Sequence, residues 1–376
     1  MPNLHQESEN YEEFESEDIG DNDDYPTEPF DAKRVDVAIT TPNLGALITR
    51  LEHGEIDLMP DFQRSGDLWS KQLQSRLIES ILIRLPIPAF YFDAALDDSW
   101  QIVDGLQRLS AIDNFVVKKN LTLTKLEFLT EYEGCSYDEL PRALQRRIEE
   151  FQISVYLIRP GTPVPMKYSL FNRINTGGLK LNPQEIRHAM SQSINRGTAS
   201  KFLTRLITTD SFKTIVANKN YRMAHDELAL RHVSFVISGL SSYKSSMPKF
   251  LNQGMFDLGN LTEEEFNTLE CNFISSLETA FTIFENNAFK KSLAIPGHKK
   301  VVNKPLFEAV SVSLAQISPI EQKILIDKKN EVIQNFISLL ENEKFENSIS
   351  KSTANTENVQ TRFNMVHKTI EELLLG

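Results

Sequence analysis

Residues 100–109 read Trp-Gln-Ile-Val-Asp-Gly-Leu-Gln-Arg-Leu, and this stretch decides the interpretation of the fold. The segment Trp100–Val103 is short and largely apolar, as is typical of a buried strand. Asp104-Gly105 is a turn pair, and apolar residues then recur at helical spacing. The stretch therefore predicts a strand that passes through a tight turn directly into a helix over residues 106–118.

The sequence on both sides of this stretch predicts more strands and helices in alternation. A helix is expected over residues 70–84, with Ser70 as its N-cap. Two further strands are expected, at Ala89–Asp93 and at Phe151–Ile158. Because strands separated by helices are typical of an α/β sheet, we assign a small mixed α/β domain to residues 34–190.

Beyond residue 190 the apolar pattern is almost wholly helical, and we assign an all-helical region to residues 191–376. The expected fold class is therefore α+β, with the small α/β domain followed by the helical region. The expected helices lie near residues 199–208, 226–239, 262–285, 304–316, 319–340 and 357–375, and residues 241–249 are expected to be a polar connection.

The negative charge of the chain is concentrated at its N-terminus. The formal net charge is −12, from 52 Asp and Glu against 40 Lys and Arg. Residues 1–32 contain 12 of these acids and no Lys or Arg, which leaves 40 acids against 40 bases elsewhere. We expect residues 1–33 to be a disordered acidic tail, because such a composition cannot offset the entropy of ordering. Such a tail increases solubility or occupies a basic groove.

Composition also argues against several classes of protein. Cys135 and Cys271 are the two cysteines, and neither they nor the seven histidines show a metal-ligand spacing. No stretch reaches 18 apolar residues and the N-terminus is acidic, so we expect a cytoplasmic protein without a membrane contact. The motifs GxxxxGK[ST], HExxH and GxSxG do not occur, which argues against a P-loop ATPase and a classical hydrolase.

Asp104, Gly105 and Arg108 form the pattern most indicative of chemistry. The free backbone N–H groups at a helix start attract phosphate or carboxylate, and glycine allows a ligand to approach the backbone. A cation such as Arg108 in the first helical turn is unfavourable unless an anion joins it. Alternatively, Asp104 is simply the N-cap of the helix and Arg108 its partner in a surface ion pair. The residues alone leave both interpretations open.

Two further polar clusters accompany this turn. Gln63-Arg64 lies in a loop, and Gln and Arg together suit multidentate recognition of a phosphate or a base edge. Asn172, Arg173 and Asn175 precede a pair of glycines, where helix capping does not explain them.

Capping does explain the segment that follows. Asn182 is expected to be an N-cap, Pro183 the first helical residue, and Glu185 the acidic member of a capping box. The segment therefore predicts the start of another helix.

Taken in this order, the clusters resemble the N-terminal domain family of the GmrSD-type, modification-dependent restriction endonucleases. That family is similar to the ParB/sulfiredoxin-like fold, and its hallmark is Asp-Gly-Gln-Gln-Arg, here Asp104-Gly105-Leu106-Gln107-Arg108. The resemblance spans roughly residues 40–190. The other matching segments are Phe62-Gln63-Arg64 with Trp69, Leu77-Ile78-Glu79-Ser80, Pro86-Ile87-Pro88, Phe171–Gly178 with Leu181, Glu185 and Arg187, and more loosely Asn358-Val359 with Arg362-Phe363.

The resemblance implies binding and hydrolysis of a nucleoside triphosphate (NTP) with Mg²⁺, coupled to DNA recognition or cleavage in phage defence. It implies that Asp104, Gln107 and Arg108 are catalytic, Asp104 as a metal ligand or as a carboxylate that orients water, and Gln107 and Arg108 by holding phosphates. The remaining residues implied in nucleotide binding are Gly105, Gln63, Arg64, Asn172, Arg173 and Asn175.

Two departures from the family pattern restrict this expectation. Leu106 replaces the first Gln of the hallmark, so hydrolysis is expected to be slow or absent while binding persists. The His-rich HNH nuclease motif of many restriction members is missing, so cleavage would require a partner protein such as a nuclease. The expected function is an NTP-binding component of a DNA-directed, restriction-like system. The alternatives are a DNA or modified-DNA binding module without catalysis, and a helical interaction scaffold.

Overall fold

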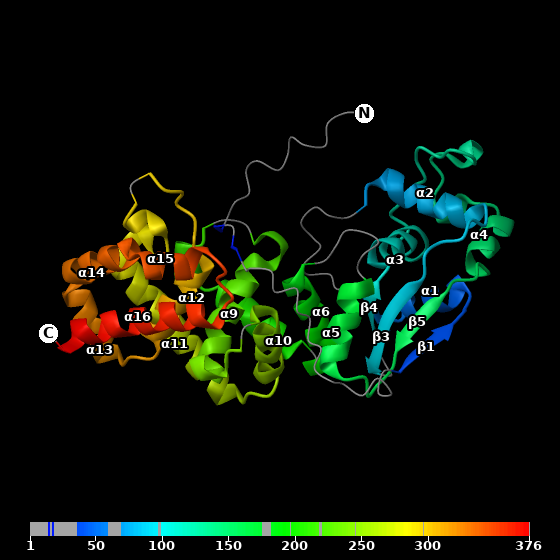
Figure 1. Ribbon diagram of the computed structural model, residues 1–376. Coiled ribbons are helices and arrows are strands. Elements are labelled where there is room, and N and C mark those ends of the chain that lie inside the picture. The colour runs from blue at the N-terminus through cyan, green and yellow to red at the C-terminus, as the bar shows by residue number, and fades with distance from the viewer. Residues whose placement is uncertain are drawn as a thin grey trace. The chain divides into compact units, whose positions relative to one another are not determined.

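The computed structural model divides the chain into two compact units, an α/β unit (Thr27–Arg196) and a helical unit (Met1–Pro26 with Gly197–Gly376) (Figure 1). The residues that the structure describes are Phe14, Glu15, Glu17, Asp18, 36–58, 69–96, 99–174, 182–195, 197–217, 220–244, 246–295 and 297–375.

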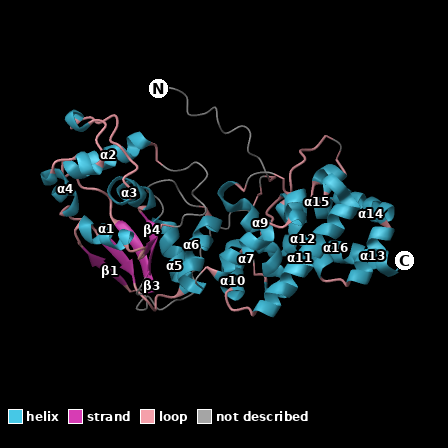
Figure 2. Cartoon of the chain, turned by 180° about the vertical axis from the view of Figure 1, so that it is seen from behind, coloured by secondary structure: helices cyan, strands magenta, loops and turns pink. Residues whose placement is uncertain are grey.

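The α/β unit is built on a mixed five-stranded sheet of order β1-β5-β3-β4-β2 (Figure 2). Strands β3 and β4 pair antiparallel, and β5 lies between β1 and β3, antiparallel to the first and parallel to the second. The expectation of a small mixed sheet is confirmed. The strands are β1 (Val37–Thr40), β2 (Ile56–Asp57), β3 (Phe90–Leu96), β4 (Ser99–Asp104) and β5 (Val155–Ile158).

Helices cover both faces of this sheet. Phe90 and Phe92 point to one face, where they pack with α1–α4, whereas Tyr91 between them packs on the other face with α5 and α6. The sheet is therefore the middle layer of three. The helices of this unit are α1 (Leu44–Glu52), α2 (Lys71–Leu82), α3 (Leu106–Ile112), α4 (Arg142–Glu149), α5 (Val164–Ile174) and α6 (Pro183–Asn195), and a π-helix, Asp113–Val117, continues α3.

The predicted helix starts are confirmed at the level of individual hydrogen bonds. The Ser70 hydroxyl accepts the N–H of Leu73 at the start of α2. In α6, Asn182 Oδ1 accepts the N–H of Glu185 at 2.9 Å, and Glu185 Oε2 accepts the N–H of Asn182 at 2.6 Å. This reciprocal pair is the capping box that the sequence predicts.

The predicted strand over residues 151–158 is longer than the observed one. Strand β5 begins only at Val155, because the backbone before it binds the start of α1 instead. The Phe151 carbonyl accepts the N–H of Leu44, and the N–H of Ile153 donates to the Pro42 carbonyl.

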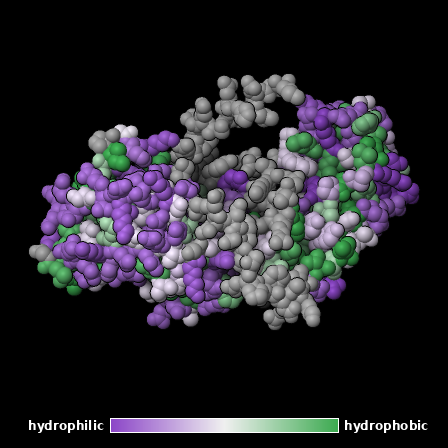
Figure 3. Space-filling view, viewed as in Figure 1, coloured by the Kyte–Doolittle hydropathy of each residue, from purple (hydrophilic) through white to green (hydrophobic). Residues whose placement is uncertain are grey.

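The helical unit encloses its own apolar core, and the face seen in Figure 3 is mostly hydrophilic over its helices. Within the described residues, no helix is long and apolar enough to cross a membrane. The helices are α7 (Thr198–Ile207), α8 (Asp210–Ile215), α9 (Ala224–Ser238), α10 (Met247–Leu258), α11 (Glu263–Phe284), α12 (Lys304–Ala315), α13 (Pro319–Asp327), α14 (Lys329–Glu341), α15 (Glu343–Ser350) and α16 (Thr356–Leu375).

The helices expected in this unit differ from the structure at several places, and α8 and α15 were not expected at all. The helix expected over residues 319–340 is two helices, α13 and α14, separated at Lys328, whose ammonium donates to the Leu373 carbonyl. The connection expected over residues 241–249 already contains the start of α10. There the Ser246 hydroxyl caps the helix and Pro248 occupies its first turn, so the residues did carry a start signal.

Four residues of the acidic segment differ from the expected disordered tail. Phe14, Glu15, Glu17 and Asp18 pack on the helical unit, where Glu15 and Glu17 pair with the buried Lys291 and Arg231 and Asp18 accepts the backbone N–H of Ser352. The physical reason is local, because ion pairs of specific geometry oppose the entropy that the composition of the whole segment cannot offset.

A buried carboxylate ties α2 to the loop before α4. Glu79 accepts the backbone N–H groups of Glu127, Phe128 and Leu129 at 2.7–3.0 Å. Burial alone would raise the pKa of Glu79, but these N–H donors and Arg76 outweigh burial and lower the pKa. A pKa below the value in the unfolded chain means that the ionised carboxylate stabilises the fold.

We expect Glu79→Gln to reduce the free energy of unfolding by about 2–3 kcal/mol at neutral pH, because the charged acceptor of several N–H groups is lost. The difference from the unaltered chain should be largest above the ordinary pKa of 4.5 and should shrink as the pH falls through the lowered pKa. Urea unfolding at several pH values measures both. Glu127→Gln is the matched control, since this exposed partner of Arg76 contributes less than about 1 kcal/mol.

Candidate functional site

The junction between β4 and α3 requires glycine. Gly105 has φ of 100°, in the left-handed region, and it is the N-cap of α3. A Cβ at this position would lie 2.6 Å from Cδ1 of Phe90, so the junction has no room for a side chain. No side chain caps α3, and the interpretation of Asp104 as its N-cap is therefore wrong. The first-turn N–H groups of α3 are left without a capping carboxylate.

Arg108 folds back from α3 onto the end of β4 and the start of β3. Its Nη2 donates to Oδ2 of Asp104 at 2.9 Å, and its Nη1 donates to the carbonyls of Pro88 and, at 3.1 Å, Ala89. The guanidinium also lies 4.9 Å from the centre of the Phe90 ring. The ion pair expected between Asp104 and Arg108 is therefore present, but the side chain of Arg108 is only 10% exposed, so the pair does not lie at the surface as that alternative expects.

The electrostatics of this turn follow from its burial. Burial lowers the pKa of Arg108, and the nearby Asp104 carboxylate opposes that shift. Tyr91 lies directly opposite Asp104 in the sheet and stacks on Tyr156, with ring centres 4.6 Å apart. Burial, Tyr156 and Asp104 together raise the pKa of Tyr91, which stays a neutral hydroxyl donor.

Gln107 links this turn to a second predicted cluster. Its Oε1 accepts the backbone N–H of Trp69 at 3.0 Å. Trp69 is the first described residue after Gln63-Arg64 in the sequence. Trp69 is thus tied to the first turn of α3.

The other predicted site residues, or their side chains, lie outside the described part of the structure. Gln63, Arg64 and Asn175 lie outside the described residues. Asn172 and Arg173 belong to α5, but the described part of the structure does not include their side chains. The structure therefore brings together Asp104, Gly105, Gln107 and Arg108, and the closing residues stay predictions.

One buried ion pair near this site was not anticipated from the sequence. Lys167 of α5 donates to both carboxylate oxygens of Asp93 in β3, at 2.7 and 2.9 Å. Both side chains are buried, so losing either partner would leave an uncompensated charge. The pair holds α5, the helix that carries Asn172 and Arg173, against the sheet. The signal for this pair in the sequence was Asp93, an acid at the end of a predicted apolar strand.

The described residues contain no group of three or more His, Cys, Asp and Glu side chains that could hold a metal ion. Asp104 alone offers a carboxylate at the turn, and its side chain is 28% exposed. Mg²⁺ commonly takes one or two carboxylates and completes its shell with water and substrate phosphates. The donor set therefore fits a metal that arrives with a nucleotide, and it does not fit a resident metal.

Comparison with known proteins identifies the domain to which this turn belongs. Residues 44–192 match the family described as the GmrSD restriction endonuclease, N-terminal domain. The resemblance expected from the motifs is thereby confirmed. No curated protein and no solved structure matches the chain.

We expect Gly105→Ala to destabilise the α/β unit by about 2–4 kcal/mol, from left-handed strain together with the clash against Phe90. Gly54→Ala is the matched control, because Gly54 has φ of 68° but open space around it. It should cost about 1–2 kcal/mol, the strain alone. Thermal unfolding of both variants measures the difference, and equal losses would show that the Phe90 contact is unimportant.

Proposed function

Starting from the match of residues 44–192 to a restriction-endonuclease domain, we propose that the α/β unit binds a nucleoside triphosphate within a restriction-like, DNA-directed system. The observation that carries this proposal is the start of α3, where no described side chain caps the helix and the partly exposed Asp104 is held by Arg108.

The start of α3 favours an anion for two reasons. Its N–H groups carry the positive end of the helix dipole, and among the described residues no side chain caps them. Asp104 and Arg108 cancel one another in charge, so the helix dipole decides the sign of the ligand that this helix start attracts. Gly105 itself is buried against the Phe90 ring, so a phosphate would reach this helix start from the side of Asp104 and Leu106, which are partly exposed.

Arg108 positions the site more than it binds the ligand in this arrangement. Three of its contacts are to Asp104, Pro88 and Ala89, and they fix the two strand ends around the turn. A guanidinium has five N–H donors, so part of its capacity is left for a phosphate oxygen. The stacked Tyr91 and Tyr156 lie on the neighbouring strands and suit a planar base.

Asp104 supplies the carboxylate that a nucleotide-bound Mg²⁺ or an attacking water would need. Its Oδ2 is held by Arg108, which fixes the orientation of the whole group. Asp104 would hold a Mg²⁺ ion that arrives with the nucleotide, and that ion would supply positive charge to the phosphates. Leu106 next to this acid has no polar atom with which to orient water, so we propose binding with slow or no hydrolysis.

A nucleotide titration tests this function. We expect GTP, CTP, UTP or ATP with Mg²⁺ to bind the unaltered chain in isothermal titration calorimetry, and Asp104→Asn to weaken binding at least tenfold. Arg50→Ala is the matched control, because Arg50 also packs on an aromatic ring and pairs with an acid in the same unit. It should leave the affinity unchanged.

The Arg108→Lys variant distinguishes the positioning role of the Arg108 side chain from the effect of its charge. It keeps the charge but loses the planar fork, so we expect a lower melting temperature together with weaker nucleotide binding. Absence of binding by all four nucleotides to the folded, unaltered chain would contradict the proposal. DNA binding with a steep salt dependence and without any nucleotide effect would instead support a non-catalytic DNA-binding module.

Leu106→Gln tests the reason given for slow hydrolysis. Restoring the polar side chain at this position should increase phosphate release at saturating NTP, while the dissociation constant stays within about threefold of the original. A phosphate-release assay measures the rate. An unchanged rate in a variant that still binds nucleotide would show that residue 106 does not control hydrolysis.

A further inference from the structure

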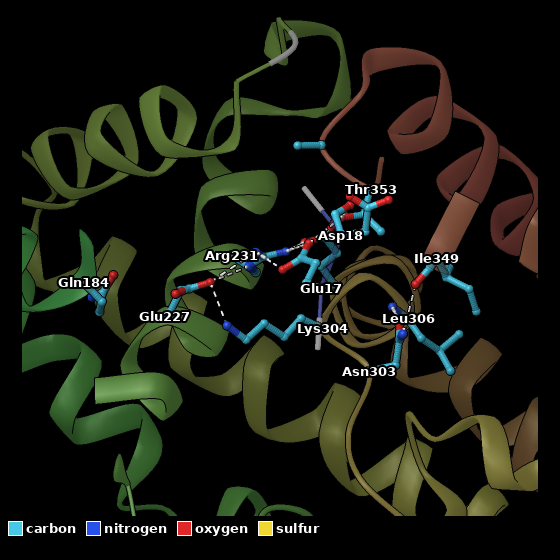
Figure 4. Close-up of polar contacts among 12 residues, drawn as sticks. Glu17, Asp18, Gln184, Glu227, Arg231, Asn303, Lys304, Leu306, Ile349 and Thr353 are labelled. Carbon is cyan, nitrogen blue, oxygen red and sulfur yellow. Dashed lines mark hydrogen bonds and ion pairs between the residues drawn. The ribbon is translucent and has the colours of Figure 1, made fainter. Parts of the chain in front are cut away.

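A carboxylate from the N-terminal segment is bound inside the helical unit (Figure 4). Glu17 Oε2 and Oε1 accept from Nη2 and Nη1 of Arg231, at 2.6 and 3.1 Å. The Thr353 hydroxyl also donates to Glu17 Oε1, at 2.7 Å. The side chain of Arg231 is 1% exposed and that of Glu17 is 8% exposed, so this bidentate pair is buried.

Without Glu17 this site has an excess of positive charge. Arg231 pairs also with Glu227 and Glu308, Lys304 pairs with Glu227, and Arg362 of α16 pairs with Glu308. Three cations thus face two acids of the helices, and Glu17 supplies the third negative charge. Burial would raise the pKa of Glu17, but Arg231 and Lys304 outweigh it and lower the pKa.

The residues around Glu17 are recognised as well. Glu15 accepts from Nζ of Lys291 at 2.8 Å and from Nδ2 of Asn303 at 2.9 Å. The ring of Phe14 lies 5.6 Å from the Lys304 ammonium. Aromatic and acidic side chains of the segment therefore each meet a matching partner.

The backbone of the segment is also bound, through an isolated parallel bridge between Phe14 and Val302 and through a second contact at Thr353. The N–H of Glu15 donates to the Val302 carbonyl at 3.1 Å, and the Asp18 carbonyl accepts the N–H of Thr353 at 2.8 Å. Main-chain hydrogen bonds with side chains in specific contacts are the usual way in which proteins recognise an extended peptide.

We propose that the helical unit contains a binding site for an extended acidic peptide of a partner protein, and that Phe14–Asp18 fills this site in cis. The peptide would carry an aromatic residue followed by Glu at the first and third positions and Asp at the fourth. Charge complementarity selects this class, because a buried guanidinium requires a carboxylate. Hydrophobic or basic segments cannot supply one.

The position of Phe14–Asp18 in the chain favours exchange over a permanent role in the core. The whole α/β unit separates Asp18 from the first residue of α7, so the segment is the one part of the helical unit that the chain contributes from the other side. A tethered ligand has an effective concentration of about a millimolar, which a partner peptide must overcome. The N-terminal segment therefore competes with the partner peptide, and this competition sets the affinity that the peptide needs in order to bind.

Peptide binding to full-length variants tests this proposal. The probe is a fluorescein-labelled peptide of residues 10–20, measured by fluorescence anisotropy. We expect it to bind the Glu15→Gln/Glu17→Gln chain at least tenfold more tightly than the unaltered chain, whose site is already filled. Adding Lys304→Ala should weaken binding several-fold, whereas Asp327→Asn, at an exposed ion pair, should not. The same peptide with Gln at both Glu positions should not bind.

A second experiment keeps the proposal testable if the double variant does not fold. A specific protease site inserted between Gly20 and Asp31 of the full chain allows the segment to be cut from the α/β unit. We expect the labelled peptide to replace the cut fragment on the folded protein. A fragment that does not exchange, or a folded double variant that ignores the peptide, would overturn the proposal and make the segment a structural staple. If the unaltered chain forms a dimer that the peptide dissociates, the proposal of a partner protein would be wrong, because a second copy of the chain would fill the site.

Discussion

The left-handed turn at Gly105 is the constraint on which the α/β unit depends. It sends the chain from β4 into α3 with the ring of Phe90 packed against the glycine, where no other residue fits. The sharp turn lets Arg108 reach back to Asp104 and to the carbonyls at the start of β3, and lets Gln107 hold the start of α2. Three segments that are distant in sequence thus meet at one helix start.

The elements that could be predicted from the sequence are those that neighbouring residues determine. Apolar periodicity and caps located α2 and α6 and the strand–turn–helix unit, because each is determined within a few residues. The break at Lys328 and the late start of β5 depend on distant backbone partners, which periodicity does not contain. The residues of the candidate site also include some that are adjacent in sequence and some that are distant. Asp104, Gly105 and Arg108 are neighbours in sequence, whereas the pairing of Asp93 with Lys167 is not.

Both units bury an arginine, but they neutralise it differently. Arg108 meets one acid and two backbone carbonyls, so its charge is matched locally and the helix dipole beside it is left unopposed. Arg231 meets three acids, one of which comes from the far N-terminal end of the chain. The first arrangement favours an added anion at a helix start. The second depends on an anion that a separate segment has to bring.

The acidic segment shows that average composition does not predict the structure of every residue in a segment. The twelve acids of residues 1–32, which contain no base, predict repulsion and a disordered tail over residues 1–33, and that reasoning treats each acid as equivalent. Glu17 is not equivalent, because Arg231 offers it a two-point contact from which water is excluded. A like-charged segment also gains from such a site, since each acid that is neutralised removes its repulsion from the others. High net charge in a segment can therefore favour ordering at a few residues, provided that the cations are already fixed elsewhere in the fold.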